Sequence, residues 1–294
     1  MSFSAEVKEE ISKLNTLKNK ELVKAELMGY CISSNVLLMK NKIRFSTENE
    51  YNINRFAKLL SNLQMDYQIG IKGKLFVITA KKESFKLYMD LEETMRLKEE
   101  MLEKLKGENE LKAFVRGAFL GAGSLTNPEQ RYHLEVIFSN LEDAEKIQKR
   151  LEEYTIYSKI LKRNKTYSIY MKDGEDISRF LAFIGASSSM LKFEEIRVIR
   201  DIRNHVNRKV NCETANLKKT VDTGVRQVED IKLIIKKKKF DELPESLQEI
   251  AKLRIKNPSM SLADLGKELK EPIGKSGVNH RLKKLEEIAE ELRK

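Results

Sequence analysis

The sequence predicts an α+β protein in three parts: a duplicated α+β domain over residues 1–199, a basic helical linker over 200–240 and an all-α helix-turn-helix domain over 241–294. Three observations predict this arrangement. The first 190 residues repeat one pattern twice, basic residues concentrate just after residue 200, and the C-terminal segment has proline and serine at the starts of short amphipathic helices. A length of 294 residues is ordinary for two or three domains.

The repeat has two copies, at about residues 20–105 and 109–190. In each copy, apolar residues recur at helical spacing, then in alternation, in the order helix, strand, helix, strand, strand, helix. The expected segments are 24–36, 43–47, 54–63, 67–78 and 84–105 in the first copy, and 113–125, 134–140, 141–154, 157–170 and 176–185 in the second. Gly73 and Asn164 stand between alternating runs and predict two hairpin turns. The stretch 36–39 is expected to pair with 43–47 as a further hairpin.

Small residues crowd the first helix of the second copy. Gly117 and Gly121 are unusual there, because each glycine costs about 1 kcal/mol relative to alanine inside a helix. Small residues three or four apart do let two helix backbones approach closely. Together with Gly29 in the first copy, they predict that the two repeats meet through this pair of helices. The alternative is a loop around Gly121–Gly123.

The linker holds most of the excess positive charge. Residues 1–199 carry a net +4, residues 200–240 a net +7 and residues 241–294 a net zero, out of +11 for the chain. Within the linker, Arg203, Asn207 and Arg208 recur on one side of a predicted helix. They are expected either to bind DNA phosphates or to pack on the first domain. The four lysines at 236–239 are expected to act as a solvated basic tether.

The C-terminal segment predicts three helices. The first begins at Pro244 and stops near Asn257; the second, 262–269, has Ser261 as its N-cap and Asp264 as an acidic capping partner. A third segment starts after Pro272, and its apolar residues recur three or four apart to the end of the chain: Val278, Leu282, Leu285, Ile288 and Leu292. Two short helices followed by a longer one predict a helix-turn-helix.

The start of the third helix carries the candidate DNA-binding residues. Recognition helices present their N-terminal side chains to base edges in the major groove. Ser276, Asn279, His280 and Arg281 are therefore expected to contact bases or backbone, and Lys275 and Lys283 to contact phosphates. The alternative for His280 is a surface histidine without a function.

Several classes of protein are excluded on sequence alone. The chain has no apolar run long enough to cross a membrane, and its first residues lack the apolar core of a secretory signal. Cys31 and Cys212 are too few and too far apart for a disulfide framework or a cysteine zinc site. No cofactor or metal motif is found. A basic, intracellular, reduced protein remains, and nucleic acid is the first partner to test. The predicted helix-turn-helix favours double-stranded DNA, so we expect a cytoplasmic, nucleoid-associated protein.

The segment Gly117-Ala118-Phe119-Leu120-Gly121-Ala122-Gly123-Ser124-Leu125 resembles the LAGLIDADG motif of homing endonucleases. The resemblance implies a duplicated αββαββα domain in which two such helices pack at a pseudo-two-fold axis and two sheets straddle DNA. In that family the last acidic residue of each motif binds the catalytic metal. Those positions correspond here to Ser33 and Ala122, and the acid nearest the first motif is Glu26. Because a hard cation needs oxygen ligands, usually carboxylates, the resemblance implies the scaffold without the cleavage.

A wider resemblance covers nearly the whole chain. Residues 116–120, 123–125 and 132–135, together with the tail Lys275-Ser276-Gly277-Val278-Asn279-His280-Arg281-Leu282, are similar to the WhiA family of bacterial transcription regulators. The first motif, 32–36, departs from the usual ending. The resemblance implies a non-catalytic regulator of sporulation and cell division genes, without a cofactor, that associates with DNA and with an RNA polymerase σ factor or another regulator.

Two other functions remain open from sequence. One is a nucleoid-associated scaffold with a role in chromosome segregation or cell division, in which the nuclease-like domain binds a protein partner and only the tail touches DNA. The weakly basic character of residues 1–199 favours this division of labour. The other is an active homing endonuclease, against which Ser33 and Ala122 argue.

Overall fold

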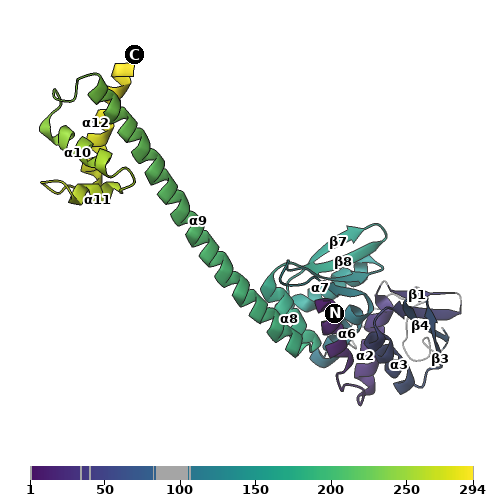
Figure 1. Ribbon diagram of the computed structural model, residues 1–294. Coiled ribbons are helices and arrows are strands. Elements are labelled where there is room, and N and C mark those ends of the chain that lie inside the picture. Colours follow the sequence, from purple (N-terminus) through teal and green to yellow (C-terminus); the bar gives the residue numbers. More distant parts are fainter. Residues whose placement is uncertain are drawn as a thin grey trace. The chain divides into compact units, whose positions relative to one another are not determined.

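The computed structural model describes residues 2–293 apart from 34, 40, 82, 84–104 and 106. Its contacts divide the chain into two compact units, Met1–Asp201 and Ile202–Lys294 (Figure 1). The helix predicted over 84–105 lies outside the described residues, except for Leu105, which is buried in the first unit.

The first unit contains the predicted repeat, and the fold class is confirmed. The first copy comprises α2 (Lys20–Ile32), β1 (Val36–Leu38), β2 (Lys42–Thr47), α3 (Glu50–Asn62), β3 (Tyr67–Lys72) and β4 (Leu75–Lys81). The second comprises α6 (Glu108–Ala122), β5 (Gly123–Leu125), β6 (Leu134–Phe138), α7 (Leu141–Glu152), β7 (Lys159–Arg163), β8 (Thr166–Met171) and α8 (Gly174–Ile184). Each copy forms an antiparallel sheet, in the orders β1-β2-β4-β3 and β5-β6-β8-β7. The two sheets therefore have the same topology.

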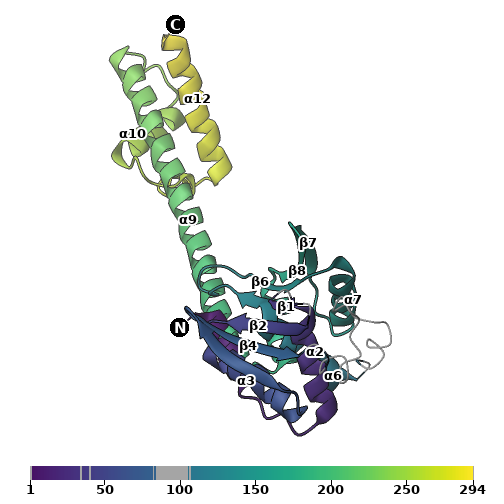
Figure 2. The same cartoon turned by 90° about the vertical axis from the view of Figure 1, so that its right-hand side faces the viewer.

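Alternation along the strands fixes which face of each sheet is buried. On β2 and β4 the buried residues are Ile43, Phe45, Ile78 and Ala80, and α3 packs against this sheet (Figure 2). Both predicted hairpins close through two-residue turns, in which Gly73 and Asn164 adopt positive φ angles of 62° and 52°. Local turn chemistry therefore sets the strand register in both copies.

Two helices end earlier than the sequence pattern suggested. The expected helices 24–36 and 113–125 stop at Ile32 and Ala122, and the residues that follow form β1 and β5. The backbone of Gly123 is extended and pairs with Val136 of β6. Apolar small residues do not distinguish the last helical turn from a short strand, so only the pairing partner decides the boundary. Gly121 remains within the helix, in contrast to the loop alternative.

An N-terminal helix, α1 (Phe3–Ser12), lies outside the predicted repeat. Phe3, Val7 and Ile11 are buried in the core of the first unit. These three apolar residues stand four apart, which is helical spacing, but the run is too short to predict a helix from the sequence alone. Glu10 on this helix accepts hydrogen bonds from the backbone N–H groups of Ser188 and Ser189 at 2.7 and 2.8 Å, and so caps the start of α9 (Ser187–Lys236).

Lys8 on α1 is expected to weaken the first unit at neutral pH. Its ammonium lies 5.8 Å from the centre of the Phe119 ring, and burial lowers its pKa from 10.5 to about 8. In the unfolded chain Lys8 keeps its proton up to about pH 10.5. The cost of burying the charged ammonium is therefore fully present below pH 8, falls as the pH rises from 8, and is absent above 10.5. Lys8→Met should raise the Tm at pH 7 by about 2–6 °C. An equal gain at pH 11 would contradict this explanation.

The second unit is a helical bundle. The C-terminal part of α9 packs with α10 (Glu245–Lys256), α11 (Leu262–Lys267) and α12 (Lys275–Arg293) (Figure 1). Its core contains apolar side chains from all four helices: Ile231, Ile234, Leu247, Ile250, Leu265, Val278, Leu282 and Leu285. Arg293 at the end of α12 forms an ion pair with Asp230 of α9. No helix in the described ranges is long and apolar enough to cross a membrane.

The second unit begins earlier than the predicted helix-turn-helix domain. Residues 200–240 were expected to form a separate linker, whereas the contacts place one boundary between Asp201 and Ile202. Ile231 and Ile234 belong to the core of the bundle, so the end of this segment is structural. The helix expected at 262–269 ends at Lys267, and Leu269 is buried in the turn that follows.

Candidate nucleic-acid interface

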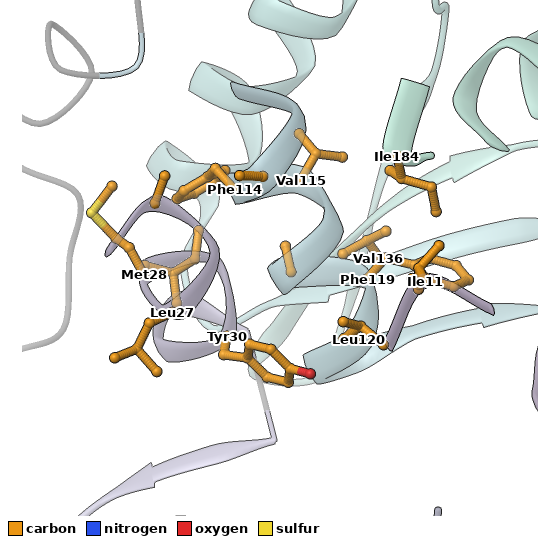
Figure 3. Packing of buried hydrophobic residues seen from close by; sticks show 14 of the residues in the cluster. Ile11, Leu27, Met28, Tyr30, Phe114, Val115, Phe119, Leu120, Val136 and Ile184 are labelled. Atoms are coloured by element: carbon orange, nitrogen blue, oxygen red, sulfur yellow. The ribbon is translucent and has the colours of Figure 1, made fainter. Parts of the chain in front are cut away.

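Helices α2 and α6 cross at very short range in the centre of the first unit. A Cβ added to Gly117 would lie 1.9 Å from the carbonyl oxygen of Glu26, and one added to Gly29 would lie 2.0 Å from that of Phe114. Around the crossing, Tyr30, Phe114 and Leu120 pack with side chains from both repeats (Figure 3). The small residues therefore bring the two repeats together, as their spacing predicted.

The positions implied to hold a catalytic metal contain no carboxylate. Ser33 is fully buried, and its hydroxyl donates to the carbonyl oxygen of Tyr30 at 2.7 Å. Ala122 is also buried and has no ligand atom on its side chain. Within the described ranges, no group of three or more histidine, cysteine or acidic side chains could hold a metal ion. These two helix ends therefore differ from a metal-dependent nuclease site in their donor atoms.

Amide side chains occupy the C-terminal end of α6 instead. Asn52 donates to the carbonyl oxygen of Leu120 at 2.7 Å, and Asn35 donates to that of Gly121 at 2.8 Å. The last carbonyls of a helix have no partner within it and need one from elsewhere. Both asparagines come from the first repeat, so these bonds hold the two repeats in register. No local pattern in the sequence indicates this role for Asn52.

The outward faces of the two sheets are unequal in charge. On the face opposite its buried residues, the first sheet carries the exposed Lys42, Lys72 and Lys81 and the half-buried Arg44. The second sheet carries Glu135, whose carboxylate accepts a hydrogen bond from Ser168 at 3.0 Å and lies 3.5 Å from Arg163. A basic first sheet and a partly neutralised second one suit weak phosphate contacts, which carry no sequence information.

Helix α12 places the predicted DNA-binding residues on its first turns. Lys275, Ser276, Asn279, His280 and Lys283 are exposed, and Arg281 is half-buried. With about 100° between successive residues, Ser276, His280 and Lys283 lie opposite the buried stripe, while Asn279 and Arg281 lie on opposite flanks. The helix thus brings the first three together and separates Asn279 from Arg281. Acidic residues follow from Glu286 onwards, so only the N-terminal half suits an approach to phosphates.

The polar residues at the start of the segment 200–240 differ in their exposure and contacts. Arg203, Asn207 and Arg208 are exposed, within a stretch of α9 that is exposed throughout from Asp201 to Lys219. By contrast, Arg200 donates to the carbonyl oxygen of Pro128 at 2.5 Å and lies over the ring of Tyr132. Arg200 therefore packs on the first unit, while the three predicted phosphate-binding residues are accessible to solvent.

Comparison with known proteins decides the family. The "Probable cell division protein WhiA" of Clostridium tetani is 40% identical over 316 residues, which span 100% of this chain and 99% of that protein. The chain belongs to the WhiA family. A relative of the same name from Clostridium acetobutylicum is 52% identical over 190 residues, 65% of this chain and 60% of that protein.

Domain and structural matches agree with membership of the WhiA family. The model of the WhiA LAGLIDADG-like domain matches residues 111–203, and that of the WhiA C-terminal HTH domain matches residues 206–289. The full-length T. maritima WhiA structure is 30% identical, with a TM-score of 0.62 and 99% of both chains covered. The structure of a WhiA N-terminal LAGLIDADG domain is 28% identical, with a TM-score of 0.52 over 63% of this chain and 92% of that one.

Proposed function

We propose that this WhiA-family chain is a non-catalytic, sequence-specific DNA-binding regulator of transcription. The observation that carries the proposal is the exposed N-terminal half of α12, which presents Ser276, His280 and Lys283 to solvent while its opposite face packs in the core of the second unit. The names of the WhiA relatives support a role in cell division, and we extend this to the control of cell division and sporulation genes. The protein would act in the cytoplasm, associated with the nucleoid.

Recognition would divide between the two types of contact. Side-chain amides, hydroxyls and imidazoles on the first turns of α12 can bond to base edges in the major groove. Lysine and arginine side chains, among them Lys275 and Arg203, would neutralise phosphates and make binding sensitive to salt. The backbone of Arg281 lies on a flank of the helix, away from the centre of the proposed interface. Its long side chain would have to extend around the helix to reach the DNA.

Substitutions on α12 test this function in the full-length chain. His280→Ala, Asn279→Ala and Arg281→Ala should each weaken binding to a specific site by about 1–3 kcal/mol, or roughly 5- to 150-fold in Kd, where the side chain reads a base. Glu291→Gln, in the exposed acidic half of α12, is the matched control and should bind at wild-type strength. Affinity is measured on a genomically selected duplex and on a scrambled one. If none of the three changes the ratio of the two affinities, α12 is not the reading helix.

The first unit would serve a second purpose. Its nuclease-like scaffold would either add weak phosphate contacts through the first sheet or bind a protein partner such as an RNA polymerase σ factor. The weak overall charge of residues 1–199 favours the protein partner, which keeps the scaffold function as the alternative. DNA binding that persists in the α12 variants at low salt would assign phosphate contacts to the first unit or to α9.

We expect no metal-dependent cleavage of duplex DNA by the purified chain. Ser33 and Ala122 give a divalent cation no carboxylate at the helix ends, so a cation would not be held against a scissile phosphate. The measurement is incubation of the full chain with genomic DNA and Mg²⁺ or Mn²⁺, followed by mapping of ends. Discrete cuts that EDTA abolishes would revive the nuclease function.

A further inference from the structure

A small pocket in the second unit gathers three cationic side chains from three helices. Its volume is about 300 Å³, and its walls come from α9, α10, the start of α11 and the first residue of α12. Lys219, Arg254 and Lys275 supply the cations, and no carboxylate lines the pocket among the described residues. A concave site lined by charge of one sign concentrates the field of that charge. The charges of the lining residues therefore indicate that the pocket binds an anion.

Arg254 is the decisive residue, because it is a buried cation to which the described residues offer no partner of opposite charge. Only 1% of its surface is exposed. Its Nη1 donates to the carbonyl oxygens of Pro258 and Met260 at 3.2 and 2.7 Å, which supports the turn after α10. Its Nε is buried without a hydrogen-bond partner in the described part of the chain, where no ion pair involves Arg254 either. A buried charge normally requires a counter-charge, so Arg254 retains an unused donor and an unmet charge.

The neighbouring acid does not neutralise this pocket. The carboxylate of Asp264 accepts a hydrogen bond from the Ser261 hydroxyl at 2.7 Å and pairs with Lys267 at 3.0 Å. The pocket wall is also firmly set. A Cβ added to Gly224 would lie 1.8 Å from the carbonyl oxygen of Pro258, so α9 lies directly against the turn that Arg254 supports. The three cations therefore line a space that no carboxylate of the described residues enters.

We propose that this pocket binds a phosphate group, whose charge the lining cations Arg254, Lys219 and Lys275 would balance. A phosphate has oxygens for several donors at once, and guanidinium and ammonium groups both bind it strongly. Thr223 also lines the pocket, and its side chain carries a hydroxyl group. The volume lies at the lower end of the range for small-molecule sites, enough for a phosphate and the group it is attached to.

The phosphate can come from two sources. One is a backbone phosphodiester of bound DNA. Lys275 is the first residue of α12, so this source would anchor the backbone at the start of the proposed recognition helix; this version rests on the proposed function. The other source is a small phosphorylated molecule that binds without DNA and would make the second unit responsive to its concentration.

The experiment compares two adjacent lysines of α9 in the full-length chain. Lys219→Gln removes a cation that lines the pocket, while Lys218→Gln removes a neighbouring cation that is also exposed but does not line it. In the first arm, about 10 mM pyrophosphate is added without DNA at constant ionic strength. The small-molecule source predicts a rise in Tm of about 3 °C for wild type and Lys218→Gln, and none for Lys219→Gln. In labelled protein, the Nε–H resonance of Arg254 should shift with the same dependence.

In the second arm, duplex affinity is measured across salt concentrations. The DNA source predicts that the slope of log K against log salt falls by about 0.9 for Lys219→Gln and stays at the wild-type value for Lys218→Gln. If the two variants behave alike in both arms and the Arg254 resonance does not move, the phosphate site is overturned. If the wild type binds no duplex at all, the proposed function fails, and the pyrophosphate arm alone then decides the pocket.

Discussion

Gly117→Ala is expected to destabilise the first unit by more than about 4 kcal/mol, an effect outside the usual range for a single methyl group. The added Cβ would lie 1.9 Å from the carbonyl oxygen of Glu26 and 2.8 Å from its carbonyl carbon. Both are backbone atoms of α2, so relief requires the two central helices to separate. Separation would open the packing around Tyr30 and Phe114 and strain the bonds from Asn52 and Asn35.

Whether Gly117→Ala raises or lowers the free energy of unfolding distinguishes helix propensity from close helix crossing. Helix propensity alone predicts that alanine at an interior position stabilises the helix by about 1 kcal/mol over glycine. Close helix crossing predicts the opposite. Urea denaturation of the full chain measures the difference, with Gly70→Ala as the matched control, because a Cβ added there has no atom within 4 Å. Gly70→Ala should leave the midpoint nearly unchanged. A stabilised Gly117→Ala would refute the close crossing.

Glu26→Gln is expected to cost about 3–5 kcal/mol, because it leaves two buried guanidinium groups without a counter-charge. The carboxylate of Glu26 accepts from Arg55 at 2.7 and 2.8 Å, and lies 3.3 Å from Arg116. Arg116 also donates to the carbonyl oxygen of Ile184 at 2.8 Å, which connects the crossing to the end of α8. One acid thus compensates cations from both repeats.

A second acid on the same helix provides the control. Glu21 pairs with Lys24 at 2.9 Å, but both side chains are exposed, and such pairs contribute little. Glu21→Gln should therefore change the free energy of unfolding by less than about 0.5 kcal/mol. If Glu26→Gln has an equally small effect, the buried cluster does not stabilise the first unit. The cluster also accounts for Glu26, the acid nearest the first motif, as a structural rather than a metal-binding residue.

Parts of the candidate interface were predictable because they depend on local chemistry. The cap formed by Ser261 and Asp264 is present as expected, and its bonds span three residues. The same holds for the turns at Gly73 and Asn164, where backbone sterics alone select the conformation. The exposed positions on α12 follow from the spacing of its buried residues. None of these features requires knowledge of a distant segment.

Other parts could not be predicted, because a charged side chain reads as a surface residue until its partners are known. Nothing near Arg254 in the sequence indicates that it is buried in a pocket whose other cations come from Lys219 and Lys275. For a similar reason, the sequence did not show that the end of the segment 200–240 belongs to the helical bundle. Ile231 and Ile234 lie in a strongly basic stretch, and only the bundle packed against them shows that they belong to a core.

By itself, the sequence determined the repeat, the hairpins, the helix-turn-helix and the absence of acids at Ser33 and Ala122, since each depends on residue type and short spacing. Tertiary structure alone decided which charges are buried and that the end of the segment 200–240 packs into the helical bundle. Glu26 meets Arg55 and Arg116 across 29 and 90 residues of chain. Burial of a charge depends on the groups that surround it, and those groups are brought together only when the chain folds.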